Sequence, residues 1–191
     1  MATPMFVNED PYLGRRLTQP ELVEELMSIT FAGSGTTPST LTYLLYAMSK
    51  DTVRQECLHL NEVKNLPYLN AVLKETFRLY PTIMSTLPRI LDRPVNIGDY
   101  VLPPDTLVGM QNYVHHRDAE LFHRPDEFLP ERWLEKNGDA SRIKYMESAL
   151  TPFSLGPRNC IGQNLAKAEL YLAVSNIFRK LRLQLNADMT K

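Results

Sequence analysis

Cysteine is scarce in this sequence, with Cys57 and Cys160 as the two cysteines among 191 residues. Two cysteines so far apart predict neither a disulfide framework nor a structural zinc site, which takes four ligands at short spacings. A chain without a disulfide framework is typical of a reducing compartment.

Long apolar runs and an excess of one charge are also missing. The longest apolar run lies near Leu41 to Met48, well short of the ~18 residues that indicate a membrane span. Met1 to Asp10 lacks the charged-then-apolar order of a signal peptide. The net charge is −1 and the charged residues are scattered, which leaves no basic face. We therefore expect no membrane span in this chain, no nucleic-acid partner, and one domain.

The most informative stretch runs from Phe153 to Gly162 and reads Phe-Ser-Leu-Gly-Pro-Arg-Asn-Cys-Ile-Gly. Its proline and glycine break regular structure, and apolar residues recur at helical spacing afterwards. We predict that Cys160 lies at or next to the N-terminus of a helix from about Ile161 to Lys180. Exposed amide groups and the helix dipole favour an anionic sulfur there. Such a thiolate suits a metal with one axial protein ligand, with haem iron as the leading case and a small buried side chain as the alternative.

A long helix is predicted from Thr18, which forms a capping box with Glu21, to about Ser49. Its middle, residues 32–38, reads Ala-Gly-Ser-Gly-Thr-Thr-Pro, and each of these glycines costs up to ~1 kcal/mol relative to alanine. Two alternatives stay open. Either the helix is locally opened while threonine hydroxyls bond to carbonyls one turn earlier, or two helices are joined by a turn.

A second helix is predicted from Pro67 to Leu79, and it carries Glu75 and Arg78 three residues apart on one face. An exposed ion pair there would contribute about 0–1 kcal/mol. A buried pair would need a further hydrogen-bonding partner to offset its desolvation.

Proline-rich β-like runs at 87–91, 95–101 and 106–114 predict a small antiparallel sheet with a turn at residues 103–105. His115, His116 and His123 lack carboxylate partners at metal-site spacing, so surface or hydrogen-bonding roles are expected.

The other segments carry weaker patterns. We expect a loosely ordered lead-in at residues 1–17, at most a brief helix at 51–66, a loop at 134–150 with a turn at 137–139, and a closing strand at 181–185.

Four motifs in order resemble the cytochrome P450 family. Phe153, Gly156, Arg158, Cys160 and Gly162 stand in the order F-x-x-G-x-R-x-C-x-G of its haem-binding signature. The resemblance covers nearly the whole chain, which looks like the C-terminal half of a single domain of a microsomal, fungal-like member, with the N-terminal half absent. It implies a fold that is mainly α with a small β-rich subdomain, a partial cytochrome P450 fold.

The resemblance also implies roles around the cofactor. Cys160 matches the axial ligand of iron in haem b (iron protoporphyrin IX), and Phe153, Gly156 and Gly162 match the loop that surrounds it. Arg158 matches a propionate-binding arginine, and Arg89 matches another approximately.

The middle of the long helix resembles the oxygen-binding groove of the family. Ala32 and Gly33 match its small residues, and Thr36 matches the catalytic threonine that handles protons. The sequence departs from the pattern at Gly35, where many relatives carry an acid. Without that carboxylate, protons would pass through water or Thr36 alone.

Glu75 and Arg78 resemble the family's E-x-x-R pair. Residues 128–133 resemble its F-x-P-E-R-W segment, whose arginine, here Arg132, joins the pair in a structural network.

The implied function is a haem-thiolate monooxygenase that uses dioxygen and electrons from an NADPH-dependent reductase to hydroxylate a small organic substrate. The alternatives are a truncated, non-catalytic fragment and a haem-thiolate isomerase or dehydratase, which would tolerate Gly35. Intact relatives of the implied kind are anchored on the cytosolic side of the endoplasmic reticulum, and the location of this chain is left unknown.

Overall fold

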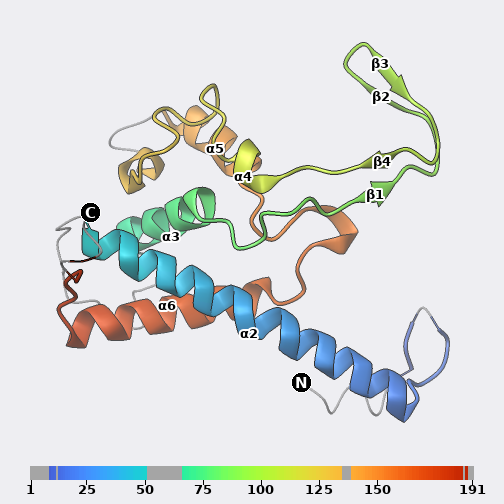
Figure 1. Cartoon of the computed structure of the whole chain (residues 1–191), viewed down its shortest axis with the longest axis horizontal. Helices are drawn as coiled ribbons and strands as arrows, with labels where there is room; N and C mark the ends of the chain where they lie inside the picture. Colours follow the sequence, from blue (N-terminus) through green and yellow to red (C-terminus); the bar gives the residue numbers. More distant parts are fainter. Residues whose placement is uncertain (1–8, 12, 51–65, 135–138, 187, 189–191) are drawn as a thin grey trace. The chain divides into compact units, whose positions relative to one another are not determined.

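The computed structural model describes residues 9–11, 13–50, 66–134, 139–186 and 188, and it is mainly helical (Figure 1). The helices are α2 (Gln19–Lys50), α3 (Pro67–Leu79), α4 (Asn112–His115), α5 (Ala140–Ala149) and α6 (Gln163–Lys180). The chain divides into two compact units, Met1–Pro38 and Ser39–Lys191, and α2 contributes residues to both. The predicted class, mainly α with a small β-rich part, is confirmed.

The start of α2 is set by the predicted capping box. The carboxylate of Glu21 accepts hydrogen bonds from the backbone N–H and the hydroxyl of Thr18, both at 2.8 Å, and Arg15 pairs with it at 2.7 Å. Hydrogen bonds from Arg15 and Thr18 hold the pKa of this carboxyl well below its usual range. Ahead of the helix, Asp10 and Arg15 form an isolated antiparallel bridge, so the described part of the lead-in is turned back on itself.

The middle of α2 is continuous helix through Gly33, Gly35 and Pro38. The alternative of two helices joined by a turn is therefore wrong. The hydroxyl of Thr36 donates to the carbonyl of Ala32 at 2.9 Å, which is the expected bond to the preceding turn. Pro38 removes one backbone donor, and the rest of the helical hydrogen-bond pattern tolerates that loss.

The main core of the second unit forms where α3 and α6 pack against the C-terminal part of α2. The amphipathic face of α3 supplies its centre, as its apolar spacing predicts. The buried members are Leu44 from α2, Leu69, Val72 and Leu73 from α3, and Leu170, Val174 and Phe178 from α6. A second apolar cluster joins Ala71 of α3 to Phe122, Trp133, Ile143 and Met146. Because α3 contributes to both clusters, its position is strongly determined.

The β-rich part consists of two separate two-stranded antiparallel ribbons instead of one sheet. Strand β1 (Arg89–Ile90) pairs with β4 (Leu107–Val108), and β2 (Val95–Ile97) pairs with β3 (Tyr100–Leu102). The run predicted at 95–101 is broken by a turn at Gly98, whose φ of +57° favours glycine. The predicted turn at 103–105 is confirmed, whereas the run at 106–114 is strand for two residues and later becomes α4.

Two local predictions were wrong. The expected loop at 134–150 contains α5, which begins after Asp139, whose side chain accepts a hydrogen bond from the Ser141 N–H at 2.9 Å. Residues 181–185 form no strand. The helix predicted from about Ile161 to Lys180 is confirmed as α6, Gln163–Lys180. The predictions for residues 1–8, 51–65 and 137–138 fall outside the described residues. Among the helices that the structure describes, none is both long and apolar enough to cross a membrane.

Gly35 offers a test of the continuous helix. A Cβ added at Gly35 would meet nothing within 4 Å, so we expect Gly35→Ala to raise the free energy of unfolding by up to ~1 kcal/mol. Gly98→Ala is the matched control and should lower it, because Gly98 has a positive φ. Urea unfolding followed by circular dichroism measures both. A destabilised Gly35→Ala variant would contradict regular helix at this position.

Candidate functional site

The cysteine loop, defined here as residues 153–162, closes on itself through its backbone. The N–H of Cys160 donates to the carbonyl of Phe153 at 2.8 Å, and a 3₁₀ helix spans Gly156–Arg158. Gly156 has a φ of +76°, a conformation that favours glycine at this place in the signature. The loop therefore presents Cys160 on a fixed backbone.

Cys160 lies three residues before α6, in the place that the helical spacing predicts. It is a free, exposed cysteine, and its carbonyl accepts a hydrogen bond from the N–H of Gln163 at 3.3 Å. The same loop exposes two apolar side chains, with Leu155 67% exposed and Ile161 93% exposed. Because Cys160 is exposed, the alternative that it is a small buried side chain is wrong.

The remaining residues of the signature lie on the same loop. The ring of Phe153 is half-buried and packs edge-on against Phe77 of α3, with ring centroids 5.2 Å apart. The side chain of Arg158 is exposed. A Cβ added at Gly162 would lie 3.8 Å from the sulfur of Cys160, which is an ordinary contact.

The other predicted cofactor residues lie elsewhere. Arg89 is in β1, and its guanidinium donates to the carbonyls of Leu87 and Pro88 at 3.2 and 2.9 Å. Ala32, Gly33 and Thr36 belong to the first unit, and each is placed only within that unit.

A buried carboxylate lies at the centre of the predicted structural network. Glu75 and Arg78 are both fully buried and form a two-point ion pair, with N···O distances of 3.0 and 2.8 Å. Arg132 donates to the same carboxylate at 3.1 Å. Its side chain is 8% exposed, and burial lowers the pKa of Arg132. The structure therefore brings together the three residues that the motifs single out.

Two further groups donate hydrogen bonds to the carboxylate of Glu75, and the sequence analysis missed both. The indole N–H of Trp133 donates to Glu75 at 2.8 Å, and the backbone N–H of Leu129 donates at 2.9 Å. Trp133 follows Arg132 directly in the F-x-P-E-R-W segment, so its position in the motif was the available signal.

The arginine of the pair also fixes a segment that is distant in sequence. The guanidinium of Arg78 donates to the carbonyls of His116, Pro125 and Glu127 at 2.9, 2.6 and 2.9 Å. His116 is fully buried, so the hydrogen-bonding role expected for it holds and the surface alternative does not. Burial, together with the charges of His115 and Arg78, lowers the pKa of His116 to about 4.

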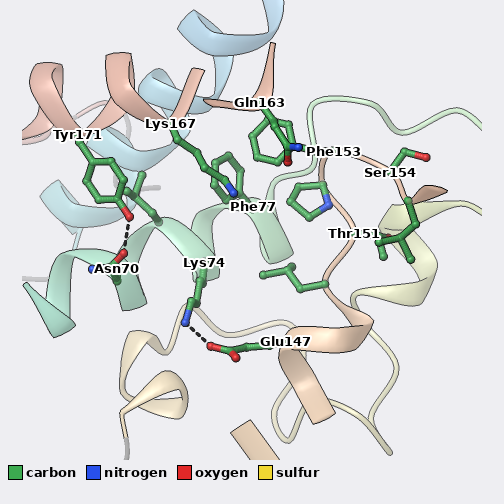
Figure 2. A pocket seen from close by; sticks show the side chains of 14 residues that line it. Asn70, Lys74, Phe77, Glu147, Thr151, Phe153, Ser154, Gln163, Lys167 and Tyr171 are labelled. Atoms are coloured by element: carbon green, nitrogen blue, oxygen red, sulfur yellow. Dashed lines mark hydrogen bonds and ion pairs between the residues drawn. The ribbon is translucent and has the colours of Figure 1, made fainter. Parts of the chain in front are cut away.

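A cavity of about 370 Å³ lies between α3, α6 and residues 150–155, which include the first residues of the cysteine loop (Figure 2). Figure 2 shows Lys74 of α3 reaching Glu147 of α5, and Tyr171 of α6 reaching Asn70 of α3. Cys160 is not among the residues that line the cavity, so the cavity is not the place where the thiol is presented.

Replacement of Glu75 tests whether the buried network contributes more to stability than an ordinary surface ion pair. We expect Glu75→Ala to lower the free energy of unfolding by ~3–5 kcal/mol, because it leaves two buried guanidinium groups without their anion. Arg124→Ala is the matched control, since Arg124 and Glu127 form an ion pair at the same three-residue spacing with side chains 52% and 50% exposed. Its loss should be much smaller, because an exposed ion pair contributes little to stability. Equal losses in the two variants, measured by urea unfolding, would contradict a special role for the buried network.

Comparisons with known proteins agree with the motifs. The family model "Cytochrome P450" matches residues 5–191. Human mitochondrial sterol 26-hydroxylase is 34% identical over 185 residues, which cover 89% of this chain and 34% of the relative. Rat mitochondrial 25-hydroxyvitamin D-1 alpha hydroxylase is 34% identical over 178 residues, which cover 85% of this chain and 34% of the relative. These names are mitochondrial and do not support the microsomal kind that the motifs implied.

A crystal structure of a cytochrome P450 matches the fold with a TM-score of 0.80 and 20% sequence identity, covering 98% of this chain and 45% of the other. The expected partial cytochrome P450 fold is therefore confirmed. The chain spans about a third of the length of the curated relatives that it matches. On its motifs, its fold and a family match across residues 5–191, the chain belongs to the cytochrome P450 family.

Proposed function

We propose that this protein is part of a haem-thiolate monooxygenase, which uses dioxygen and electrons from an NADPH-dependent reductase to hydroxylate a small organic substrate. The observation that carries the proposal is the free thiol of Cys160, which is exposed on the backbone-closed loop of the haem-binding signature. Family membership supports the same chemistry.

The residues around Cys160 fit a haem b group. The sulfur of Cys160, as thiolate, would ligate the iron, and the exposed Leu155 and Ile161 of the same loop offer apolar surface to a largely apolar macrocycle. The exposed guanidinium of Arg158 can neutralise a propionate by charge-assisted hydrogen bonds. When bound, such a haem supplies the activation of dioxygen, and the thiolate ligand favours cleavage of the O–O bond. Arg89 is a weaker candidate for a second propionate, because its guanidinium already binds two carbonyls of its own segment.

The backbone around Cys160 has the task of holding the sulfur still. The bond between the Cys160 N–H and the Phe153 carbonyl fixes the cysteine, and the packing of Phe153 on Phe77 fixes the start of the loop. α6 begins three residues later, at Gln163, and holds the other end of the loop.

Thr36 is the residue that we propose to handle protons. Its Oγ1 donates to the carbonyl of Ala32, which orients the hydroxyl, and a hydroxyl oxygen can also accept a hydrogen bond from water. Ala32 and Gly33 are small and exposed, and they leave this side of α2 open for oxygen and water. Gly35 cannot supply the acid that many family members carry next to the threonine.

The identity of the substrate is proposed only as a class. The named relatives hydroxylate sterols and vitamin D compounds, which are apolar molecules, and this supports an apolar organic substrate. Gly35 favours one second candidate, a haem-thiolate isomerase or dehydratase, because those reactions need the thiolate without a proton relay.

The assignment of Cys160 is tested by the reduced, carbon monoxide-bound form of the full-length protein. We expect Cys160→Ser to lose the thiolate-type Soret band, because a serine hydroxyl cannot replace thiolate donation to the iron. Cys57→Ser is the control and should keep the band. An unchanged band in Cys160→Ser would show that another group ligates the iron.

The role of Thr36 is tested by how electrons are divided between products. We expect Thr36→Val to raise the ratio of hydrogen peroxide released to substrate hydroxylated, because the valine keeps the shape of the side chain and loses the hydroxyl. Thr37→Val is the control and should leave this ratio near its starting value. An unchanged ratio in Thr36→Val would favour proton delivery by water alone or the isomerase and dehydratase alternative.

A further inference from the structure

Thr151, two residues before the cysteine loop, is held by three hydrogen bonds from one short helix and the residue after it. Asn112, the first residue of α4, donates its amide N–H to the carbonyl of Thr151 and accepts from the Thr151 hydroxyl, both at 3.1 Å. His116, directly after α4, accepts from the Thr151 N–H through Nε2 at 3.1 Å. The backbone N–H, the carbonyl and the hydroxyl of Thr151 are thus all bound, which fixes both the position and the orientation of this residue.

The same contacts connect the buried carboxylate to the cysteine. Arg78, paired with Glu75, donates to the carbonyl of His116, and the ring of His116 binds Thr151. The carbonyl of Thr151 also accepts from the Ser154 N–H at 3.1 Å, and Phe153 accepts from the N–H of Cys160. A continuous series of hydrogen bonds and neighbouring backbone residues therefore connects Arg78 of α3 to Cys160.

The cysteine loop depends strongly on where its ends are held. The structure describes every residue between Thr151 and Cys160, and the short 3₁₀ helix Gly156–Arg158 is the only regular element among them. α6 follows at the other end of the loop. Thr151 is 5% exposed and His116 is fully buried, so water competes little for these bonds. The depressed pKa of His116 keeps the ring neutral at neutral pH, which leaves Nε2 able to accept.

We propose that Asn112 and His116 are positioning residues, which act through Thr151 to hold Cys160 where its sulfur can ligate haem iron as a thiolate. This inference rests on the proposed function. Neither residue touches the reacting atoms in this role. Their loss should loosen the start of the cysteine loop, so that a neutral thiol or another group replaces the thiolate more often.

The test uses the full-length, haem-loaded protein and the Soret region of its reduced, carbon monoxide-bound form, which separates thiolate-ligated haem from thiol-ligated haem. The hydrogen bonds that Asn112 and His116 form with Thr151 are called the clamp here. Asn112→Ala, His116→Leu and the near-isosteric Thr151→Val each remove part of it. We expect a several-fold rise in the fraction that is not thiolate-ligated, smallest for Thr151→Val because the backbone bonds of Thr151 remain. His116→Gln should restore much of the wild-type fraction, since its side-chain carbonyl can accept from the Thr151 N–H.

Two control variants separate the clamp from general damage. Asn176→Ala removes a half-buried α6 side chain whose amide donates to the carbonyl of Leu172 at 2.8 Å, and His115→Leu removes the half-buried neighbouring histidine. Both should keep the wild-type fraction of thiolate-ligated haem.

The outcomes are distinct. Variants that all match wild type would overturn the clamp while leaving the proposed function intact. If His116→Leu holds no haem, Asn112→Ala and Thr151→Val decide, and wild-type spectra in both would overturn the proposal. A wild-type protein without a thiolate band would overturn the proposed function, and the inference that rests on it would fall too.

Discussion

The charge on Glu75 has no contact with solvent, and much of the second unit is arranged to compensate for it. Leaving water costs a carboxylate several kcal/mol unless its lone pairs are bound by well-placed donors. Those donors come from α3 itself and from residues 129–133, more than fifty positions later in the sequence. The carboxylate of Glu75 therefore holds α3 and residues 129–133 in contact. Apolar packing of Phe122 and Trp133 with Ala71 further stabilises this contact.

Local patterns in the sequence predicted the helices best where specific end signals exist. Pro67 opens α3, and the capping box of Thr18 and Glu21 opens α2. The α5 helix was missed because it is mostly polar, and its buried residues, Ile143 and Met146, set up no extended apolar period. The strands were misjudged for a different reason. Ribbons with two or three residues per strand are defined by pairing across the chain, which a single run of residues does not reveal.

The candidate site shows the same division between local and distant information. The signature predicted the cysteine loop and its helix, since those depend on neighbouring residues. The full burial of His116 was missed, because its partners Arg78 and Thr151 lie 38 and 35 positions away. Its sequence neighbourhood, with His115 and Arg117 on either side, is polar and typical of a surface. A buried polar side chain becomes recognisable only when the groups that satisfy it are known.

The two anchors on either side of α5 have a consequence for how the length of this chain can vary. Trp133 is tied to Glu75 and Thr151 is tied to α4, and between them Ile143 and Met146 hold α5 in the second apolar cluster. The connection between Trp133 and α5 is therefore held at both of its ends. Doubling the length of such a connection costs only about 0.6 kcal/mol in closure entropy. Between Thr151 and Cys160, by contrast, one extra residue would shift the sulfur relative to its anchor. Insertions and deletions should therefore accumulate between Trp133 and α5 and be rejected between Thr151 and Cys160.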